Sequence, residues 1–322
     1  MSFSSEVKGE LARLDVTKKC CMLAELAGFL RVSSSIRLAG GGKFSIVAST
    51  ENAAIARHYK KLIKDYFGSN TMLEVGDSQM PGKSRAKGHN RYYLTISPDE
   101  KSSQILRETG MMLVREGNDY FSDGIYSPIV KSKCCKKSYI RGLFLGCGTI
   151  SDPKKSYHME FVLERSQMAL DLKKLIGTFV DLSANITKRK DSFIVYMKKA
   201  AYISDMLGIL GADSAMLEFE ETRISKEAHG EAQRLLNCDS ANVDRTLSAS
   251  EEQISWINII EKAEGLEWLP EPLREVALLR LERPEASLSE IGESLQTPIK
   301  KPGVNKRFAK IKAIAEQINR HE

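Results

Sequence analysis

The sequence predicts an α+β fold in which an αββαββα repeat occurs twice about a pseudo-twofold axis and is followed by an all-α helix-turn-helix domain. The first observation is an internal likeness: "LAELAGFLRVSSSIRL" (residues 23–38) and "YIRGLFLGCGTISDP" (residues 139–153) align when Gly28 is placed on Gly142. The apolar residues that then coincide are Leu26 with Ile140, Phe29 with Leu143, Leu30 with Phe144 and Ile36 with Ile150. The second observation is that similar strand-like and helical patterns follow both segments. The third observation is a capped, basic helical pattern near the C-terminus. A pattern that occurs twice indicates an internal duplication.

The first repeat is expected over about residues 1–116 and begins with the glycine-containing helix. Two alternating segments, "SSSIRLA" and "KFSIVAS", flank Gly40-Gly41-Gly42 and predict a β-hairpin. The segment "ENAAIARHYKKLIKDYF" has apolar residues at helical spacing, with Asn52 as its cap. Strand-like "TMLEVGD" and "RYYLTIS" then flank a basic loop with Lys83, Arg85, Lys87 and Arg91, and a helix near residues 103–114 closes the repeat.

The second repeat is expected over about residues 131–213, after a turn-rich linker at residues 117–133. Its glycine-containing helix is expected over residues 137–146. The later elements are expected as strands near 149–151 and 158–163, a helix over 166–179, strands within 182–188 and 192–198, and a helix over 200–211. Because the order of elements agrees, we expect both repeats to form one domain, residues 1–222.

A helical linker is expected over residues 223–265, and the helix-turn-helix domain over residues 266–322. Ser287 and Glu290 have the spacing of a capping box, and Pro302 suits the first turn of the next helix. A turn of three to five residues is expected between these two helices. The apolar residues expected to pack across the turn are Val304, Phe308, Ile311 and Ile314 on one helix and Leu288, Ile291 and Leu295 on the other.

The charge of the chain is unevenly distributed. Its 322 residues carry a net charge of +6, and the positive excess lies before Arg223. A second basic group follows in the acidic C-terminal part, with no Asp or Glu among its members: Lys300, Lys301, Lys306, Arg307, Lys310 and Lys312. Such segregation indicates a face for a polyanion, although a solvated helix face is the more common interpretation of an isolated charge run.

Composition and sequence ends predict the compartment. The uncharged run from Gly142 to Ser151 is far shorter than the roughly 18 residues that a membrane span needs. Glu6 and Glu10 stand where a secretory signal would have a basic end and an apolar run. We expect a cytoplasmic, nucleoid-associated protein without a membrane partner.

Two pairs of adjacent cysteines, Cys20-Cys21 and Cys134-Cys135, precede the glycines of the two repeats. Disulfides are not expected in the cytoplasm. A four-thiolate zinc site joining the repeats is the alternative, but zinc ligands in a chain are usually two to four residues apart. We therefore expect buried thiols at helix starts, and no metal or cofactor.

Glycines in an apolar helix indicate a close helix crossing, because only small residues let two backbones approach. We expect Gly28, Gly142 and Gly146 at this interface between the repeats. "LAGFLRVSS" and "IRGLFLGCG" resemble degenerate copies of the LAGLIDADG motif of homing endonucleases. With the C-terminal helix-turn-helix pattern, the whole chain resembles the WhiA family of bacterial transcription regulators.

The resemblance also implies what the repeats lack. In the active endonucleases the eighth position of the motif is an acidic metal ligand, and this position falls on Ser33 and Cys147. Neither side chain offers a carboxylate to a hard cation. Without paired carboxylates a two-metal cleavage mechanism has no ligands, so we expect no nuclease activity and no catalytic residues. Other enzyme motifs, such as a P-loop or a histidine metal pair, are missing from the sequence.

The helix after Pro302 is the expected DNA reader. Asn305, Lys306 and Lys310 are expected to face outward, where asparagine can read adenine and lysine can donate to guanine. Phosphates are expected to be met by Lys300, Lys301, Arg307 and Lys312. A generic helical bundle is the alternative. The lysines near the second glycine helix, together with Arg141, are expected either on the DNA-facing side of the repeats or simply on the surface; they are Lys131, Lys133, Lys136 and Lys137.

The resulting prediction is a sequence-specific, DNA-binding transcription regulator that is not an enzyme. The family resemblance implies a role in cell division, chromosome segregation or sporulation of Gram-positive bacteria. The expected partners are double-stranded DNA and, as a further candidate, another transcription regulator or a sigma factor. The alternative function is a protein-interaction scaffold in which the degenerate nuclease domain binds another regulator.

Overall fold

The computed structural model describes residues 2–77 and 90–320, and the chain forms two compact units, Met1–Ser225 and Lys226–Glu322. The helix α8 (Asp213–Ala263) contributes residues to both units. No helix within the described ranges is long and apolar enough to cross a membrane. Of the expected basic loop, Lys83, Arg85 and Lys87 lie outside the described residues. The placement of Arg91 in that loop is wrong: it lies in the strand Asn90–Ile96, and its Nη2 is 3.3 Å from the Glu51 carboxylate.

The first half of the Met1–Ser225 unit contains a four-stranded antiparallel sheet of order β1-β2-β4-β3. Helices α2 and α3 precede the two strand pairs, as predicted. The elements are α1 (Phe3–Leu11), α2 (Lys19–Ser33), β1 (Ser34–Leu38), β2 (Phe44–Thr50), α3 (Ala53–Phe67), β3 (Met72–Asp77), β4 (Asn90–Ile96), a 3-10 turn (Pro98–Glu100) and α4 (Ser102–Glu108).

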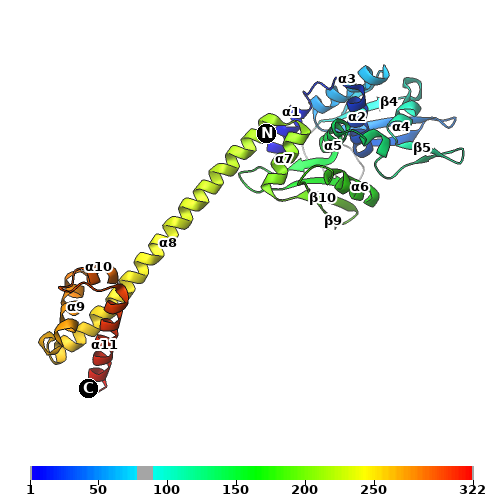
Figure 1. Ribbon diagram of the computed structural model, residues 1–322. Coiled ribbons are helices and arrows are strands. Elements are labelled where there is room, and N and C mark those ends of the chain that lie inside the picture. The colour runs from blue at the N-terminus through cyan, green and yellow to red at the C-terminus, as the bar shows by residue number, and fades with distance from the viewer. Residues whose placement is uncertain (1, 78–89, 321–322) are drawn as a thin grey trace. The chain divides into compact units, whose positions relative to one another are not determined.

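The second half repeats this arrangement with a sheet of order β7-β8-β10-β9, again antiparallel throughout. Its elements are α5 (Lys133–Cys147), β7 (Gly148–Ile150), β8 (Met159–Leu163), α6 (Ser166–Ile176), β9 (Asn185–Arg189), β10 (Ser192–Met197) and α7 (Ala200–Leu210). The two glycine-containing helices, α2 and α5, pack side by side within this unit (Figure 1). The predicted duplicated αββαββα fold is confirmed.

The predicted linker between the repeats is wrong in part, because residues 112–121 form a hairpin. The helix predicted to reach Val114 ends at Glu108, and β5 (Met112–Arg115) pairs with β6 (Asn118–Phe121). Glu116 and Gly117 form the two-residue turn and both have positive φ, which is the backbone form that matches strand twist in a tight hairpin. A 3-10 turn (Ser127–Val130) then leads into α5.

Local sequence explains where the other elements begin and end. Gly40, Gly41 and Gly42 all have positive φ between β1 and β2, a conformation that other residues adopt at a cost. The Asn52 side chain accepts hydrogen bonds from the amides of Ala54 and Ile55 and so caps α3 as predicted. The helix α1 was not predicted; it buries Phe3, Val7 and Leu11 in the hydrophobic core of the Met1–Ser225 unit.

The Lys226–Glu322 unit is helical and has its own core. The end of α8 packs with α9 (Glu271–Glu282), α10 (Leu288–Glu293) and α11 (Lys301–Asn319), and a 3-10 turn (Leu266–Trp268) precedes α9. The capping box predicted at Ser287 and Glu290 is present. The predicted linker, residues 223–265, lies almost wholly within α8, and its Ile257 and Ile260 are buried in this core. The domain boundaries at 222 and 265 stay a prediction.

Candidate nucleic-acid interface

The crossing of α2 and α5 is so close that two glycines touch the backbone of the partner helix. A Cβ on Gly28 would collide with the carbonyl oxygen of Tyr139, and a Cβ on Gly142 would collide with that of Glu25 and lie 2.8 Å from the Phe29 amide nitrogen. Each contact is the counterpart of the other under the alignment of Gly28 with Gly142. The two helices are therefore related by a pseudo-twofold axis that passes through the crossing.

A third glycine lies nearer the C-terminal ends of these helices. A Cβ on Gly146 would lie 2.5 Å from both the Ser33 Oγ and the Val32 Cγ2. Gly28, Gly142 and Gly146 thus all lie where α2 meets α5. Glycines occur in these two apolar helices because the crossing leaves no space for a side chain, and not because the backbone needs flexibility.

The last residues of α2 and α5 are the positions that the resemblance to the LAGLIDADG motif marks as metal ligands. Here they are Ser33 and Cys147. The Ser33 hydroxyl is buried and hydrogen-bonds to no described residue. Burial raises the pKa of Cys147 to about 12, although the charge of Lys8 acts in the opposite direction. A neutral thiol and a hydroxyl replace the two carboxylates, so this end of the crossing offers poor ligands to Mg²⁺.

An ion pair that the sequence did not predict crosses between the repeats. Glu25 is fully buried, and its carboxylate lies 2.9 Å from the Arg141 Nη1 and 2.7 Å from the His58 Nε2. The Arg141 Nε also donates to the carbonyl oxygen of Leu210, at 2.6 Å. The placement of Arg141 on the surface or on a DNA-facing side is therefore wrong: its charge balances a buried carboxylate.

In the Lys226–Glu322 unit, α10 and α11 form the predicted helix-turn-helix. The turn spans residues 294–300 and is longer than expected, because α10 ends already at Glu293. The amide of Ile299 donates to the carbonyl of Gly292 at 3.0 Å, and a Cβ on Gly292 would collide with the Ile299 carbonyl oxygen. This close approach fixes how α11 leaves the turn.

The buried side of α11 orients its polar side. Val304, Phe308 and Ile311 are buried, and they pack in one cluster with Ile291 and Leu295 as predicted. Helical spacing then directs the remaining side chains away from the core. The predicted contact residues that are solvent-exposed are Lys300, Lys301, Asn305, Lys306, Lys310 and Lys312. The N-terminus of α11 has no side-chain cap, but Pro302 has no amide hydrogen and the amides of Gly303 and Val304 donate to the Lys300 carbonyl, so the exposed lysines rather than a row of free amides would meet an anion here.

Two of the predicted phosphate contacts already have partners in this unit. The half-buried Arg307 donates to the carbonyl oxygen of Pro272 at 3.2 Å and lies 3.8 Å from the Glu275 carboxylate. The Lys312 Nζ lies 3.9 Å from the Glu316 carboxylate and 5.1 Å from the centre of the Trp256 ring. A phosphate contact by either cation would require exchange of these partners.

Arg280 in α9 supports the helix-turn-helix from inside its core. It is almost fully buried, and its guanidinium donates to the Gln253 Oε1 at 2.9 Å and to the carbonyls of Pro284 and Ala286 at 3.1 and 2.6 Å. Its Cζ also lies 5.6 Å from the centre of the Phe308 ring. One side chain thus connects α8, the loop before α10, and α11.

The cysteines lie at helix starts as expected, and Cys21 and Cys135 are buried there, but Cys20 is exposed and Cys134 is half-buried. Cys20 and Cys21 in α2 and Cys134 and Cys135 in α5 bring their four sulfur atoms within 4.8 Å of one another. We refer to these four residues as the cysteine cluster. It lies at the N-terminal ends of the two helices, whereas Ser33 and Cys147 lie at their C-terminal ends.

Comparison with known proteins agrees with this architecture. Residues 19–112 match the family model of the WhiA N-terminal LAGLIDADG-like domain, residues 136–229 that of the WhiA LAGLIDADG-like domain, and residues 232–315 that of the WhiA C-terminal HTH domain. The chain is 40% identical over 317 residues to the "Probable cell division protein WhiA" of Alkaliphilus metalliredigens, with 98% of each chain covered. It is 41% identical over 320 residues to the protein of the same name from Clostridium acetobutylicum, with 99% of each covered.

A solved structure has the same fold. The crystal structure of full-length DUF199/WhiA from Thermotoga maritima matches with a TM-score of 0.60 and 24% identity, over 98% of this chain and 99% of that one. The fold and the glycine crossing define a duplicated LAGLIDADG-like domain joined to a C-terminal helix-turn-helix domain. The chain belongs to the WhiA family.

Proposed function

We propose that this protein is a DNA-binding transcription regulator that acts in bacterial cell division, with α11 as the helix that enters the major groove. The name of its relatives, "Probable cell division protein WhiA", supports the cellular role. Roles in chromosome segregation and sporulation, nucleoid association in the cytoplasm, and a second regulator or sigma factor as partner belong to the same proposal.

The observation that carries the proposal is the two-sided character of α11. One side is anchored in the core by Val304, Phe308 and Ile311. The other side is exposed and basic, and no acidic residue occurs from Ser294 to Ala315. Lys301, Lys306 and Lys310 can meet phosphates or guanine, and Asn305 can bind the edge of adenine through two hydrogen bonds.

Replacing Lys301, Lys306 and Lys310 together by alanine is expected to weaken DNA binding and its dependence on salt. Each lost phosphate contact lowers the slope of log affinity against log salt by about one unit. The full-length protein would first be incubated with fragmented genomic DNA, and the retained fragments would supply the site. Binding of a fluorescent duplex would then be measured across a series of salt concentrations.

A matched control removes the same charge from the other unit. Lys64 on α3 and Lys173 and Lys174 on α6 are exposed. Their triple alanine variant should retain the slope of the unaltered protein. The reader assignment is wrong if the α11 variant keeps both affinity and slope. The Asn305→Ala change should cost about 1–3 kcal/mol at the recovered site and little on unrelated DNA.

The protein is also expected to leave DNA uncut. Ser33 and Cys147 supply no carboxylate where a nuclease of this fold would hold its metal ions. Supercoiled plasmid carrying the recovered site should remain intact with the protein and Mg²⁺ or Mn²⁺. Metal-dependent nicking that copurifies with the protein, and that disappears when Ser33 is changed to alanine, would contradict this proposal.

A second function, binding of a protein partner by the repeat domain, is favoured by the character of its second sheet. The strands β7 to β10 carry only Glu160, Lys188 and Arg189 as charged residues, and Glu160 pairs with His158. A sheet that binds DNA should carry more basic residues than this one does. If the repeat domain binds a protein partner, a variant that no longer binds DNA through α11 should still bind that partner.

A further inference from the structure

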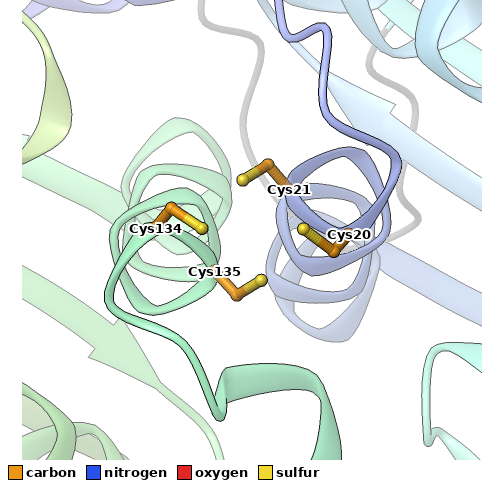
Figure 2. A group of neighbouring side chains, drawn as sticks. All are labelled: Cys20, Cys21, Cys134 and Cys135. Atoms are coloured by element: carbon orange, nitrogen blue, oxygen red, sulfur yellow. The ribbon is translucent and has the colours of Figure 1, made fainter.

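The cysteine cluster is formed by two elements that are far apart in the sequence. Cys20 and Cys21 lie in the first turn of α2, and Cys134 and Cys135 lie in the first turn of α5. Figure 2 shows the four thiol side chains pointing into the space between these two helices. All four sulfur atoms lie within 4.8 Å of one another. Two adjacent cysteines can therefore contribute to one cluster here, because each pair only has to face the other pair across the helix crossing.

The geometry of the cluster suits four-coordinate binding. A zinc ion with four sulfur ligands at about 2.3 Å has sulfur atoms about 3.8 Å apart, so the thiols would have to close by no more than about 1 Å. The alignment of Gly28 with Gly142 places Cys20 on Cys134 and Cys21 on Cys135. The pseudo-twofold axis thus relates the two pairs, and a tetrahedron has twofold axes that relate its corners in this way.

The charges around the cluster favour thiolates. Neither first turn contains an acidic residue, and both helices direct the positive ends of their dipoles toward the sulfur atoms. The nearby lysines are Lys18, Lys19, Lys133, Lys136 and Lys137. Positive charge of this kind compensates the net negative charge of a divalent ion bound by four thiolates.

Hydroxyl groups support individual sulfur atoms. The Ser132 Oγ lies 3.2 Å from the Cys134 Sγ. Cys20 is exposed, which gives an ion a path from solvent.

We propose that Cys20, Cys21, Cys134 and Cys135 form a binding site for one thiophilic divalent cation, Zn²⁺ by its chemistry, which joins the two repeats at the N-terminal end of their crossing. Four sulfur donors in a tetrahedral arrangement select zinc or iron over the hard cations Mg²⁺ and Ca²⁺. The site is closed by four protein ligands, so its role is structural. It does not depend on the proposed DNA-binding function and lies at the opposite end of α2 and α5 from Ser33 and Cys147.

Metal analysis of the full-length protein tests the site directly. Protein purified under reducing conditions, without an affinity tag that binds metal, is expected to contain one zinc ion per chain by mass spectrometry of the elements. After removal of the zinc, Co²⁺ should restore one equivalent, with the intense visible bands of tetrahedral cobalt and a thiolate-to-cobalt charge-transfer band. Zn²⁺ should displace that cobalt and abolish the bands, because zinc binds such sites more tightly.

Two variants separate the cluster from other thiols. The C20S/C134S variant removes one ligand from each helix and is expected to lose both the zinc and the cobalt spectrum. The C147S variant changes a cysteine of the same helix outside the cluster and is expected to keep both. Removal of zinc should lower the melting temperature of the unaltered protein and leave that of C20S/C134S unchanged.

Two results would overturn the proposal. One is a metal-free protein with four free thiols that gives no tetrahedral cobalt spectrum. The other is resistance of the four cysteines to alkylation until a reductant is added, which would indicate disulfides between α2 and α5 in place of a metal. If C20S/C134S does not fold, the cobalt titration of the unaltered protein still decides between these outcomes.

Discussion

Replacing Gly142 by alanine is expected to destabilise the Met1–Ser225 unit by about 3 kcal/mol or more, because the new methyl group has no space. It would collide with the Glu25 carbonyl oxygen and the Phe29 amide, which are backbone atoms inside a helix and cannot move independently. The two helices would have to separate, which would also lengthen the buried contact between Glu25 and Arg141. Such a loss is a large part of the 5–15 kcal/mol that stabilises a typical domain.

Chemical denaturation can assign the loss to one unit. Both tryptophans, Trp256 and Trp268, lie in the Lys226–Glu322 unit, so their fluorescence reports that unit alone. Gly142→Ala should shift the transition in far-ultraviolet circular dichroism and leave the tryptophan transition in place. Gly9 in α1 is the matched control, since a Cβ there meets nothing within 4 Å, and Gly9→Ala should be neutral or stabilising. Equal stability of the two variants would show that the crossing has room for a methyl group.

Replacing Arg280 by methionine is expected to destabilise the Lys226–Glu322 unit by about 3 kcal/mol or more and to abolish DNA binding as a consequence. Methionine fills a similar volume but donates no hydrogen bond. The Gln253 side chain and the carbonyls of Pro284 and Ala286 would then remain buried without their donor, at about 1–3 kcal/mol for each unsatisfied group. The loop before α10 and the Phe308 face of α11 would lose their common support.

The tryptophan transition is the measurement for this variant. Arg283→Met is the control, because the Arg283 side chain is exposed and donates a long hydrogen bond, 3.4 Å, to the Ser294 hydroxyl. Its stability should stay within about 0.5 kcal/mol of the unaltered protein. The role assigned to Arg280 is wrong if both variants unfold at the same denaturant concentration and bind DNA equally well.

Features that depend on neighbouring residues could be predicted from the sequence. The triple glycine of the first hairpin, the Asn52 cap and the Ser287 capping box each act within a few residues. The glycine positions of the crossing were predictable because the motif occurs twice, and duplication supplies a partner helix without any knowledge of the fold. The apolar spacing of α11 likewise indicated which of its sides would be exposed.

Features that depend on distant partners could not be predicted. Arg141 stands in a stretch without acids, and its partner Glu25 lies in the other repeat. Arg280 lies among apolar residues of α9. Their helical spacing alone does not reveal that the Gln253 side chain and two backbone carbonyls accept hydrogen bonds from it. The usual spacing of zinc ligands along one chain segment did not suggest that these cysteines would meet, but two helices each contribute two of the four neighbouring sulfur atoms. The turn before β6 was not predicted, because Glu116-Gly117 is not one of the favoured hairpin dipeptides, although Gly117 suits the positive φ of that turn.

Because of the contact between Glu25 and Arg141, neither repeat can take the place of the other at the crossing. Under the alignment of Gly28 with Gly142, Glu25 corresponds to Tyr139, and Arg141 corresponds to Ala27. Two copies of the first repeat would bury two carboxylates with no guanidinium between them, and two copies of the second would bury two guanidiniums with no carboxylate. Neither half could therefore assemble with itself, and the divergence of a few buried residues has made a once symmetric pairing permanent within a single polypeptide.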